Sequence, residues 1–195
     1  ISWQNMEMKI PIEVSARHIH LSQKDLEKLF GKGYKLKKLR QLNQPGDFCA
    51  EESLELGAGD KKIKGVRIVG PAREQTQVEI SLTDAIFLGV TPPVRLSGDL
   101  EGSAAFTLIG PAGAIKLSEG LIIAQRHIHC GIGEAENFGL ENNSLVSVKI
   151  EGERAATFHN VKVRVKDDYK ICMHIDTDEG NAAGINKIGK GTIIL

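Results

Sequence analysis

The sequence predicts a mainly β protein with a few short helices, organised as two β-rich halves. The apolar segments are short, are rich in Val, Ile and Thr, and several alternate apolar with polar side chains, as residues 161–166 do. That period of two is typical of half-buried strands. Gly, Pro, Asn and Asp separate these segments. The tetrapeptide Arg-His-Ile-His occurs at 17–20 and again at 126–129, once in each half.

Seven segments carry the strand pattern, and each is bounded by turn residues. Both tetrapeptides lie at or near the end of such a segment, where the chain leaves a predicted strand. The seven segments are residues 9–22, 61–70, 76–90, 120–129, 144–152, 157–167 and 169–178.

Three short helices are predicted between the strands. Ser22 is a candidate N-cap for a helix that contains Leu26, Leu29 and Phe30 and stops at Gly31. Residues 133–139 and 177–185 have the composition of helical turns, the latter opening on Thr177 before two acidic residues. Each tetrapeptide is therefore followed by a helix or a helical turn.

We expect a tail at residues 1–9, a first half at 10–95 and a second at 96–195, with an approximate boundary near the Gly- and Pro-containing segment 91–103. The halves are small barrels or sandwiches. The competing arrangement is a single domain in which the two halves intertwine. The repeat itself is visible only around the tetrapeptide.

Composition excludes several classes of protein. With 195 residues, 41% of them hydrophobic and 26% charged, the chain is globular and long enough to bury a core. The 25 basic residues equal the 25 acidic ones, so no global field favours nucleic acid or a membrane surface. Three separated cysteines predict a reducing, cytoplasmic compartment. No apolar run is long enough to cross a bilayer.

The two tetrapeptides are candidate metal-binding motifs. In an extended strand, residues i and i+2 share one face, so His18 and His20 point together, as do His127 and His129, about 7 Å apart at their Cα atoms. Imidazole is a common ligand of zinc and similar ions. A single His-x-His pair is weak evidence, whereas the same pair twice in the same context favours two metal sites.

Each pair needs further ligands, and the sequence offers several. His174 is a candidate third nitrogen; Glu79, on one strand face with Gln77, is a candidate acid that residue patterns alone do not distinguish from the other acidic residues. Arg73, after a Gly-Pro turn, suits an anion such as phosphate, although a surface ion pair is the commoner role for an isolated arginine. Cys130 and Cys172 could be ligands or nucleophiles, but buried, unreactive thiols are the commoner case. His159 is expected at the surface.

Eight segments occur in an order that resembles the PduL-type phosphate propanoyltransferases, a family of phosphotransacylases. They read SARHIHLS, QPGDF, GPAREQTQVEIS, PVRLSGD, GSA, IGPAG, AQRHIH and HIDTDEGNAAG, and the resemblance runs from about residue 10 to the C-terminus. It implies two β-barrel domains packed with an active site between them, and two zinc ions per chain.

The resemblance also assigns residues. His18, His20 and Glu79 would hold a first zinc that accepts the coenzyme A sulfur, and His127, His129 and His174 a second zinc completed by water or phosphate. Arg73 would bind phosphate and serve catalysis. None of these seven positions departs from the family pattern, and no cysteine matches a family ligand.

The implied reaction converts acyl-CoA and phosphate into acyl phosphate and CoA, reversibly. Arg73 and the second zinc would orient phosphate, zinc would accept the leaving thiolate, and direct attack is favoured over an acyl-enzyme because no nucleophile is indicated. Two rival functions use the same histidines: a di-metal hydrolase of thioesters or related esters, and a module whose closed metal sites only stabilise it.

We also expect a homodimer and no nucleic-acid or membrane partner. Microcompartment members of the family carry an amphipathic N-terminal extension. The residues before Lys9 are too few and too polar to form one, which favours a free cytoplasmic enzyme or a processed end over a microcompartment protein. The preference between acetyl and propanoyl groups is not readable from the sequence.

Overall fold

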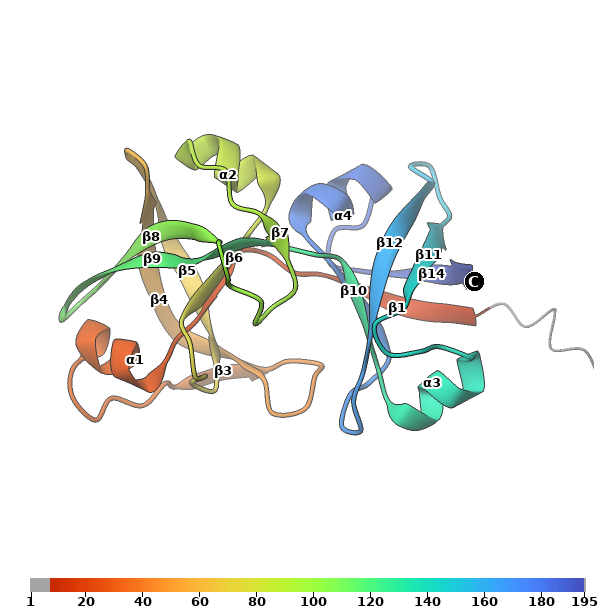
Figure 1. The fold of residues 1–195 in the computed structure, drawn as a ribbon, viewed down its shortest axis with the longest axis horizontal. Coiled ribbons are helices and arrows are strands. Elements are labelled where there is room, and N and C mark those ends of the chain that lie inside the picture. The colour runs from red at the N-terminus through yellow and green to blue at the C-terminus, as the bar shows by residue number, and fades with distance from the viewer. Residues whose placement is uncertain (1–7, 195) are drawn as a thin grey trace, which may run out of the picture. The chain divides into compact units, whose positions relative to one another are not determined.

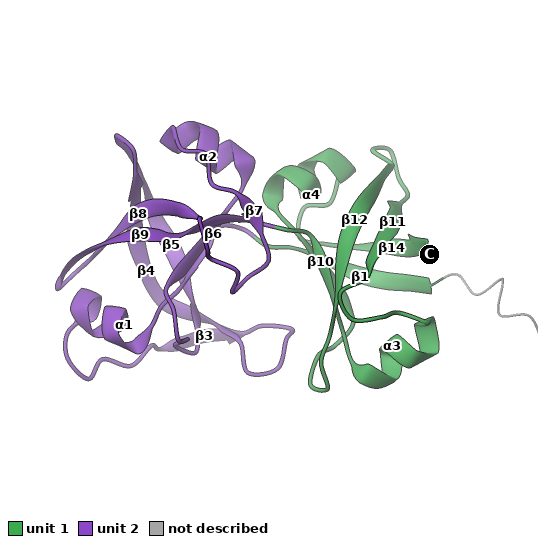
Figure 2. Cartoon of the chain, viewed as in Figure 1, with its two compact units in different colours: residues 1–15, 125–195 green, residues 16–124 purple. Residues whose placement is uncertain are grey.

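The computed structural model describes residues 8–194, and it confirms a mainly β protein with short helices. The chain forms two compact units (Figure 2). We call residues 16–124 the central barrel, and the described residues of the other unit, 8–15 together with 125–194, the terminal barrel. The helices of residues 8–194 are too short and too polar for any of them to span a bilayer.

The central barrel is a closed ring of six strands, because every strand in it pairs with the next and the last pairs with the first. Two short strands, β3 (Lys38–Gln41) and β7 (Val94–Arg95), pair with one end of β4 (Phe48–Ala58) and of β9 (Gly113–Ala124), beyond the residues of these strands that pair with β8 (Ala104–Gly110). In ring order the six strands are β2 (His18–His20), β5 (Lys61–Gly70), β4 (Phe48–Ala58), β8 (Ala104–Gly110), β9 (Gly113–Ala124) and β6 (Gln77–Ile80).

The terminal barrel is closed by six strands as well. Figure 1 shows that it combines strands from the two ends of the sequence, red for β1 and blue for β14. In ring order its strands are β1 (Met8–Val14), β13 (Cys172–Ile175), β10 (His127–Cys130), β12 (Ala156–Val165), β11 (Leu145–Ile150) and β14 (Ile188–Ile194).

The two barrels repeat one topology. The histidine strands β2 and β10 each have a parallel neighbour, β5 or β12, and an antiparallel one, β6 or β13. Each remaining pairing also recurs with the same direction: β4–β5 matches β11–β12, β4–β8 matches β11–β14, β8–β9 matches β14–β1, and β6–β9 matches β13–β1. The repeat therefore covers a whole barrel, far beyond the local motif that the sequence shows.

The bounds of the units differ from the expected halves at 10–95 and 96–195. β1 lies at the start of the sequence yet closes the terminal barrel, while β8 and β9 return to the central barrel because they pair with β4 and β6. Strand pairing, not the Gly- and Pro-rich loop, sets the boundary. Most of the expected tail, residues 1–9, lies outside the described residues.

Within residues 8–194, four helices connect the strands, and one of them corrects a prediction. α1 (Gln23–Phe30) begins after the predicted cap Ser22 and stops at Gly31, and α3 (Ile132–Phe138) and α4 (Thr177–Ala183) also form. The prediction of one strand over 76–90 was wrong, because α2 (Leu82–Leu88) follows β6. Ser81 accepts a hydrogen bond from the N–H of Asp84, whose carboxylate accepts one from the N–H of Ser81, a capping box that starts this helix.

Each barrel has its own apolar core. Ile19 and Ile128, which lie between the two histidines of each tetrapeptide, are fully buried in the two separate cores. Because successive side chains of a strand point to opposite faces, burial of these isoleucines directs the flanking histidines away from the core. The predicted orientation of both histidine pairs is therefore confirmed.

Candidate metal centres

His18 and His20 converge at one point of the central barrel. Their Nε2 atoms lie 3.1 Å apart, and their ring centroids 4.9 Å apart. Nδ1 of His18 lies 2.9 Å from the carbonyl oxygen of Ala16, and Nδ1 of His20 lies 3.2 Å from that of Val69. Hydrogen bonds donated from Nδ1 to these carbonyls fix the tautomer that leaves both Nε2 lone pairs available to an ion.

Glu79 brings a carboxylate to the same point. It lies on β6 directly opposite His18, with Oε2 3.6 Å from Nε2 of His18 and Oε1 3.8 Å from Nε2 of His20. The three donors lie within 4.8 Å of one another. Ligands about 2.0–2.1 Å from a tetrahedral zinc are separated by roughly 3.3 Å, so the observed spacing fits one such ion after a small adjustment. We call His18, His20 and Glu79 the central ligand group.

The surroundings of this group favour a neutral imidazole at His20. Burial lowers the pKa of His20 well below its usual value, and electrostatic interactions with His18 and Arg73 lower it further. A neutral imidazole is the form that binds metal. Arg73 is connected to the central ligand group through Ser97 and Gln77.

A hydrogen-bond chain connects Glu79 to Arg73. The amide nitrogen of the buried Gln77 donates to Oε1 of Glu79 at 2.6 Å and to Oγ of Ser97 at 2.6 Å. Nη1 of Arg73 donates to the same Ser97 oxygen at 3.0 Å. The side-chain oxygen Oε1 of Gln77 accepts a hydrogen bond from the N–H of Gly98 at 2.9 Å. Gln77 therefore holds both a candidate metal ligand and the loop on which Ser97 lies.

Three imidazoles meet in the terminal barrel. His127 and His129 lie on β10, and β13 places His174 directly opposite His127. Their ring centroids are 4.7 Å (His127–His129), 5.2 Å (His127–His174) and 4.9 Å (His129–His174) apart. Nδ1 of His127 lies 2.9 Å from the carbonyl oxygen of Gln125, the same contact, two residues back, that His18 makes. We call these three histidines the terminal ligand group.

Two further donors lie beside His174. Glu13, on β1, and Cys172, two residues before His174, have ligand atoms within 4.8 Å of it and of each other. Oε2 of Glu13 is 3.9 Å from Nδ1 of His174, while Nε2 of His174 is buried. This resembles a carboxylate behind a metal-binding imidazole. Sequence reasoning missed Glu13, because only the parallel pairing of β1 with β13 brings it there.

Cys130 and Cys172 are poor nucleophiles. Cys49, Cys130 and Cys172 are all free and buried. Burial, together with the charge of Glu13, raises the pKa of the Cys172 thiol to about 12, and burial with the charge of Glu134 raises that of Cys130 to about 11. Thiols with such pKa values remain protonated at neutral pH. His159 is exposed, with Nδ1 2.7 Å from Oγ of Ser147, so its predicted surface position is confirmed.

The predicted site residues thus form two sets, one in each barrel. The central set contains Arg73 and the central ligand group, and the terminal set contains the three histidines of the terminal ligand group. In both sets a His-x-His strand is paired with the strand that supplies the third residue. The donor chemistry of both sets, imidazole with or without carboxylate, suits zinc.

Comparison with known proteins identifies the family. The model of the phosphate propanoyltransferase family matches residues 11–186. A phosphate propanoyltransferase of Thermotoga maritima is 48% identical over 181 residues, which cover 92% of this chain and 86% of the relative. Those of Lachnoclostridium phytofermentans and Shewanella putrefaciens are each 50% identical, over 90% and 94% of this chain and 83% and 87% of the relatives. The chain therefore belongs to the phosphate propanoyltransferase family of phosphate acyltransferases.

Proposed function

We propose that this protein reversibly transfers a short acyl group between coenzyme A and inorganic phosphate, with two zinc ions bound by the central and terminal ligand groups. The observation that carries the proposal is the presence of two separate donor sets, each built on the same strand pair, in a chain of this family. When bound, the ions would supply Lewis-acid stabilisation of the departing thiolate and of charge on the acyl and phosphoryl oxygens.

The two donor sets differ in charge, which supports a division of work between them. Glu79 adds a carboxylate to the central group, whereas the three residues of the terminal group are imidazoles. Among the ligands themselves, Glu79 offsets part of the charge of a doubly charged ion in the central group, whereas the carboxylate nearest to the terminal group, that of Glu13, lies beside His174, 3.9 Å from its Nδ1. We assign phosphate, which is a mixture of monoanion and dianion at neutral pH, to the terminal group, and the thiolate of CoA to the central group.

Arg73 is the phosphate-binding residue in this proposal. Its side chain is half-buried, and Ser97 accepts a hydrogen bond from Nη1, which restricts the orientation of the guanidinium group. A planar, permanently charged fork of this kind can hold two phosphate oxygens at once and keep the anion aligned for attack on the thioester carbonyl.

We further propose direct attack of phosphate in a ternary complex. An acyl-enzyme would need an activated side-chain nucleophile, and the two thiols closest to the terminal group have raised pKa values. Phosphate, oriented and partly desolvated, is itself the nucleophile; the thioester C–S bond breaks as the new C–O bond forms, and the electron pair leaves with the CoA sulfur.

A thiol-release assay tests this function. Purified protein is incubated with propanoyl-CoA with and without phosphate, while CoA release and zinc content are measured on the same sample. We expect CoA release only with phosphate, and one acyl phosphate formed per CoA released. Removal of the zinc should abolish the activity. Release of CoA and free acid without phosphate would instead show the rival metal hydrolase.

Three finer properties belong to the same proposal. The relatives are named as propanoyltransferases, so propanoyl-CoA is the proposed substrate, although one methylene discriminates by only about 1–3 kcal/mol. Rates against acetyl-, propanoyl- and butanoyl-CoA measure that preference. We also propose a homodimer, which light scattering tests. The third property is the location of the protein, free in the cytoplasm or in a bacterial microcompartment, and cosedimentation with purified compartments distinguishes the two.

A further inference from the structure

Arg17, which precedes the first histidine pair, forms an ion pair with α2, the helix that follows Glu79. Nε and Nη2 of Arg17 contact Oδ2 and Oδ1 of Asp84 at 2.9 Å and 2.7 Å, a two-pronged contact to one carboxylate. Asp84 is the third residue of α2, belongs to its capping box and is almost completely buried. It follows Glu79 by five positions in the sequence. A contact of this geometry specifies orientation as well as distance.

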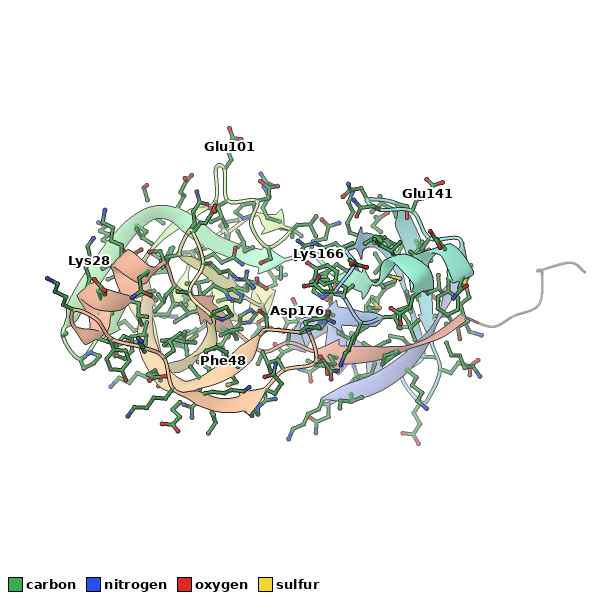
Figure 3. All side chains as sticks on the ribbon, turned by 90° about the horizontal axis from the view of Figure 1, so that it is seen from below. Lys28, Phe48, Glu101, Glu141, Lys166 and Asp176 are labelled. Carbon is green, nitrogen blue, oxygen red and sulfur yellow. The ribbon has the colours of Figure 1, made fainter. Side chains whose placement is uncertain are left out.

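The arginine before the second histidine pair repeats the contact. Nε of Arg126 lies 3.4 Å from Oε1 of Glu179, which follows His174 by five positions. Glu179 and Asp176 form the capping box of α4. Asp176 is one of the residues labelled in Figure 3. The guanidinium group of Arg126 also lies over the ring of Phe158, 5.0 Å from its centroid.

The strand register explains what these contacts hold. β2 begins at His18, and its antiparallel partner β6 ends one residue after Glu79, the residue opposite His18. Arg17 and the start of α2 are therefore at the same end of this strand pair. β10 and β13 repeat the arrangement with His127 opposite His174. In both barrels the contact ties the strand with two ligands to the segment just beyond the third.

We propose that Arg17 and Arg126 are positioning residues that keep the third ligand of each group within reach of the two histidines before any metal binds. This inference rests on the proposed function, since it presupposes metal at both groups. Its support is the recurrence of an arginine–carboxylate contact at matching positions in both barrels. Preorganised ligands lose less free energy on binding than ligands that must first be brought together.

The two contacts should not contribute equally. Arg17 makes two short contacts to a buried carboxylate. Arg126 makes one longer contact to a partly exposed carboxylate, and its guanidinium group also lies over the ring of Phe158. Loss of the arginine side chain should therefore weaken metal binding more in the central barrel than in the terminal one.

A double-mutant cycle on metal affinity tests the inference. The central group is isolated in the full-length chain by His174→Ala, and zinc affinity is measured by competition with a chromophoric chelator. Arg17→Gln and Asp84→Asn should each weaken zinc binding about 10-fold, the low end for residues that orient ligands. The double variant should be no weaker than either single one, because both changes break the same contact. Arg17→Lys should recover only part of the affinity, since lysine lacks the fork.

Controls separate positioning from general stability. Lys62→Gln removes a 2.9 Å ion pair to Glu55 between β4 and β5 of the same barrel and should leave zinc affinity unchanged. Circular dichroism of each metal-free variant shows that it is folded. The Co²⁺ spectrum of Arg17→Gln should also shift, reporting altered ligand geometry.

The outcomes are distinct. Parent-like zinc affinity and an unchanged Co²⁺ spectrum in both Arg17→Gln and Asp84→Asn, even with a lowered melting temperature, would overturn the inference and leave the proposed function intact. Additive losses in the double variant would also overturn it. A parent protein that binds no zinc through His18, His20 and Glu79 would overturn the proposed function and the inference together.

Discussion

The central and terminal barrels share strand order, pairing direction and the position of a His-x-His strand, yet they differ in the residues that surround it. The central barrel places Glu79 opposite the first histidine of its pair, and the terminal barrel places His174 there. Next to these, opposite the second histidine, Gln77 in one barrel corresponds to Cys172 in the other. The backbone thus repeats while the chemistry does not.

This difference shows how a repeated topology carries two unlike groups of candidate metal ligands. The pairing of the strands fixes where three side chains meet, and one residue on the antiparallel strand decides whether the group contains a carboxylate. The parallel neighbour differs as well: Ile122 lies beside Glu79, whereas Glu13 lies beside His174. In the central barrel the carboxylate is in the ligand group, and in the terminal barrel it lies next to that group.

The largest expected effect follows from removing one histidine from each barrel. His18→Ala and His127→Ala should each reduce phosphate-dependent CoA release by more than about 100-fold, beyond the range for residues that only orient ligands. Each should lower bound zinc from two ions to one per chain, because the two groups lie in separate barrels. Zinc analysis and initial rates of the same samples check this. His159→Ala, which changes a surface histidine, serves as the matched control.

Normal activity in either variant would contradict the claim that both ligand groups are needed, since only one group would then serve the reaction. Both variants should remain folded, because neither side chain is part of an apolar core.

A smaller effect is expected at Arg73. Arg73→Ala should lower kcat/KM for phosphate by roughly 100-fold, comparable with the loss of one preorganised charge-stabilising donor. The KM for acyl-CoA should change little, because the side chain is assigned to phosphate alone. Arg73→Lys should restore only part of the loss, since lysine keeps the charge without the planar fork. An equal rise in both KM values would contradict this assignment.

Gln77 should have a more moderate influence. Gln77→Leu removes the hydrogen bond to Glu79 and the bond to Ser97, so zinc affinity of the central group should fall about 10-fold, as for other groups that orient a metal ligand. The terminal group should keep its zinc affinity, which makes it an internal control. Chelator competition on the two groups measures this. Equal weakening of both would point to a general loss of stability.

The smallest effect is expected from the thiols. At pH 7.5 the pKa values of about 11 for Cys130 and about 12 for Cys172 leave both thiols protonated, and both are buried. Iodoacetamide should therefore label neither cysteine in the folded protein within minutes, and activity should be retained. Labelling should become rapid only in denaturant. Fast modification of Cys172 together with loss of activity would favour an acyl-enzyme over direct attack.

Local patterns predicted the local structure well. Alternation placed the histidine pairs on one strand face, and Ser22 and Gly31 marked the ends of α1. The helix α2 was not predicted, because the apolar residues of 76–90 resemble those of a strand, although Ser81 and Asp84 form the pattern of a helix capping box.

Long-range pairing could not be predicted from residue patterns. Nothing near Glu79 distinguishes it from the other acidic residues; it reaches His18 only because β6 pairs with β2. Likewise, the closing role of β1 depends on pairing with β13, more than 150 residues away in the sequence. Residue patterns offered Glu79, His174 and Arg73 only as candidates among others, and the family resemblance singled them out. The structure then places Glu79 and Arg73 in the central barrel and His174 in the terminal barrel.

The most direct test of the central claim combines zinc stoichiometry with phosphate dependence in one titration. Metal-free protein is titrated with zinc while CoA release from propanoyl-CoA is followed at saturating phosphate and without phosphate. We expect activity to require the second equivalent of zinc per chain and to be absent without phosphate. Full activity at one equivalent, or equal CoA release without phosphate, would contradict the view that the two barrels hold two metals for one phosphate-dependent transfer.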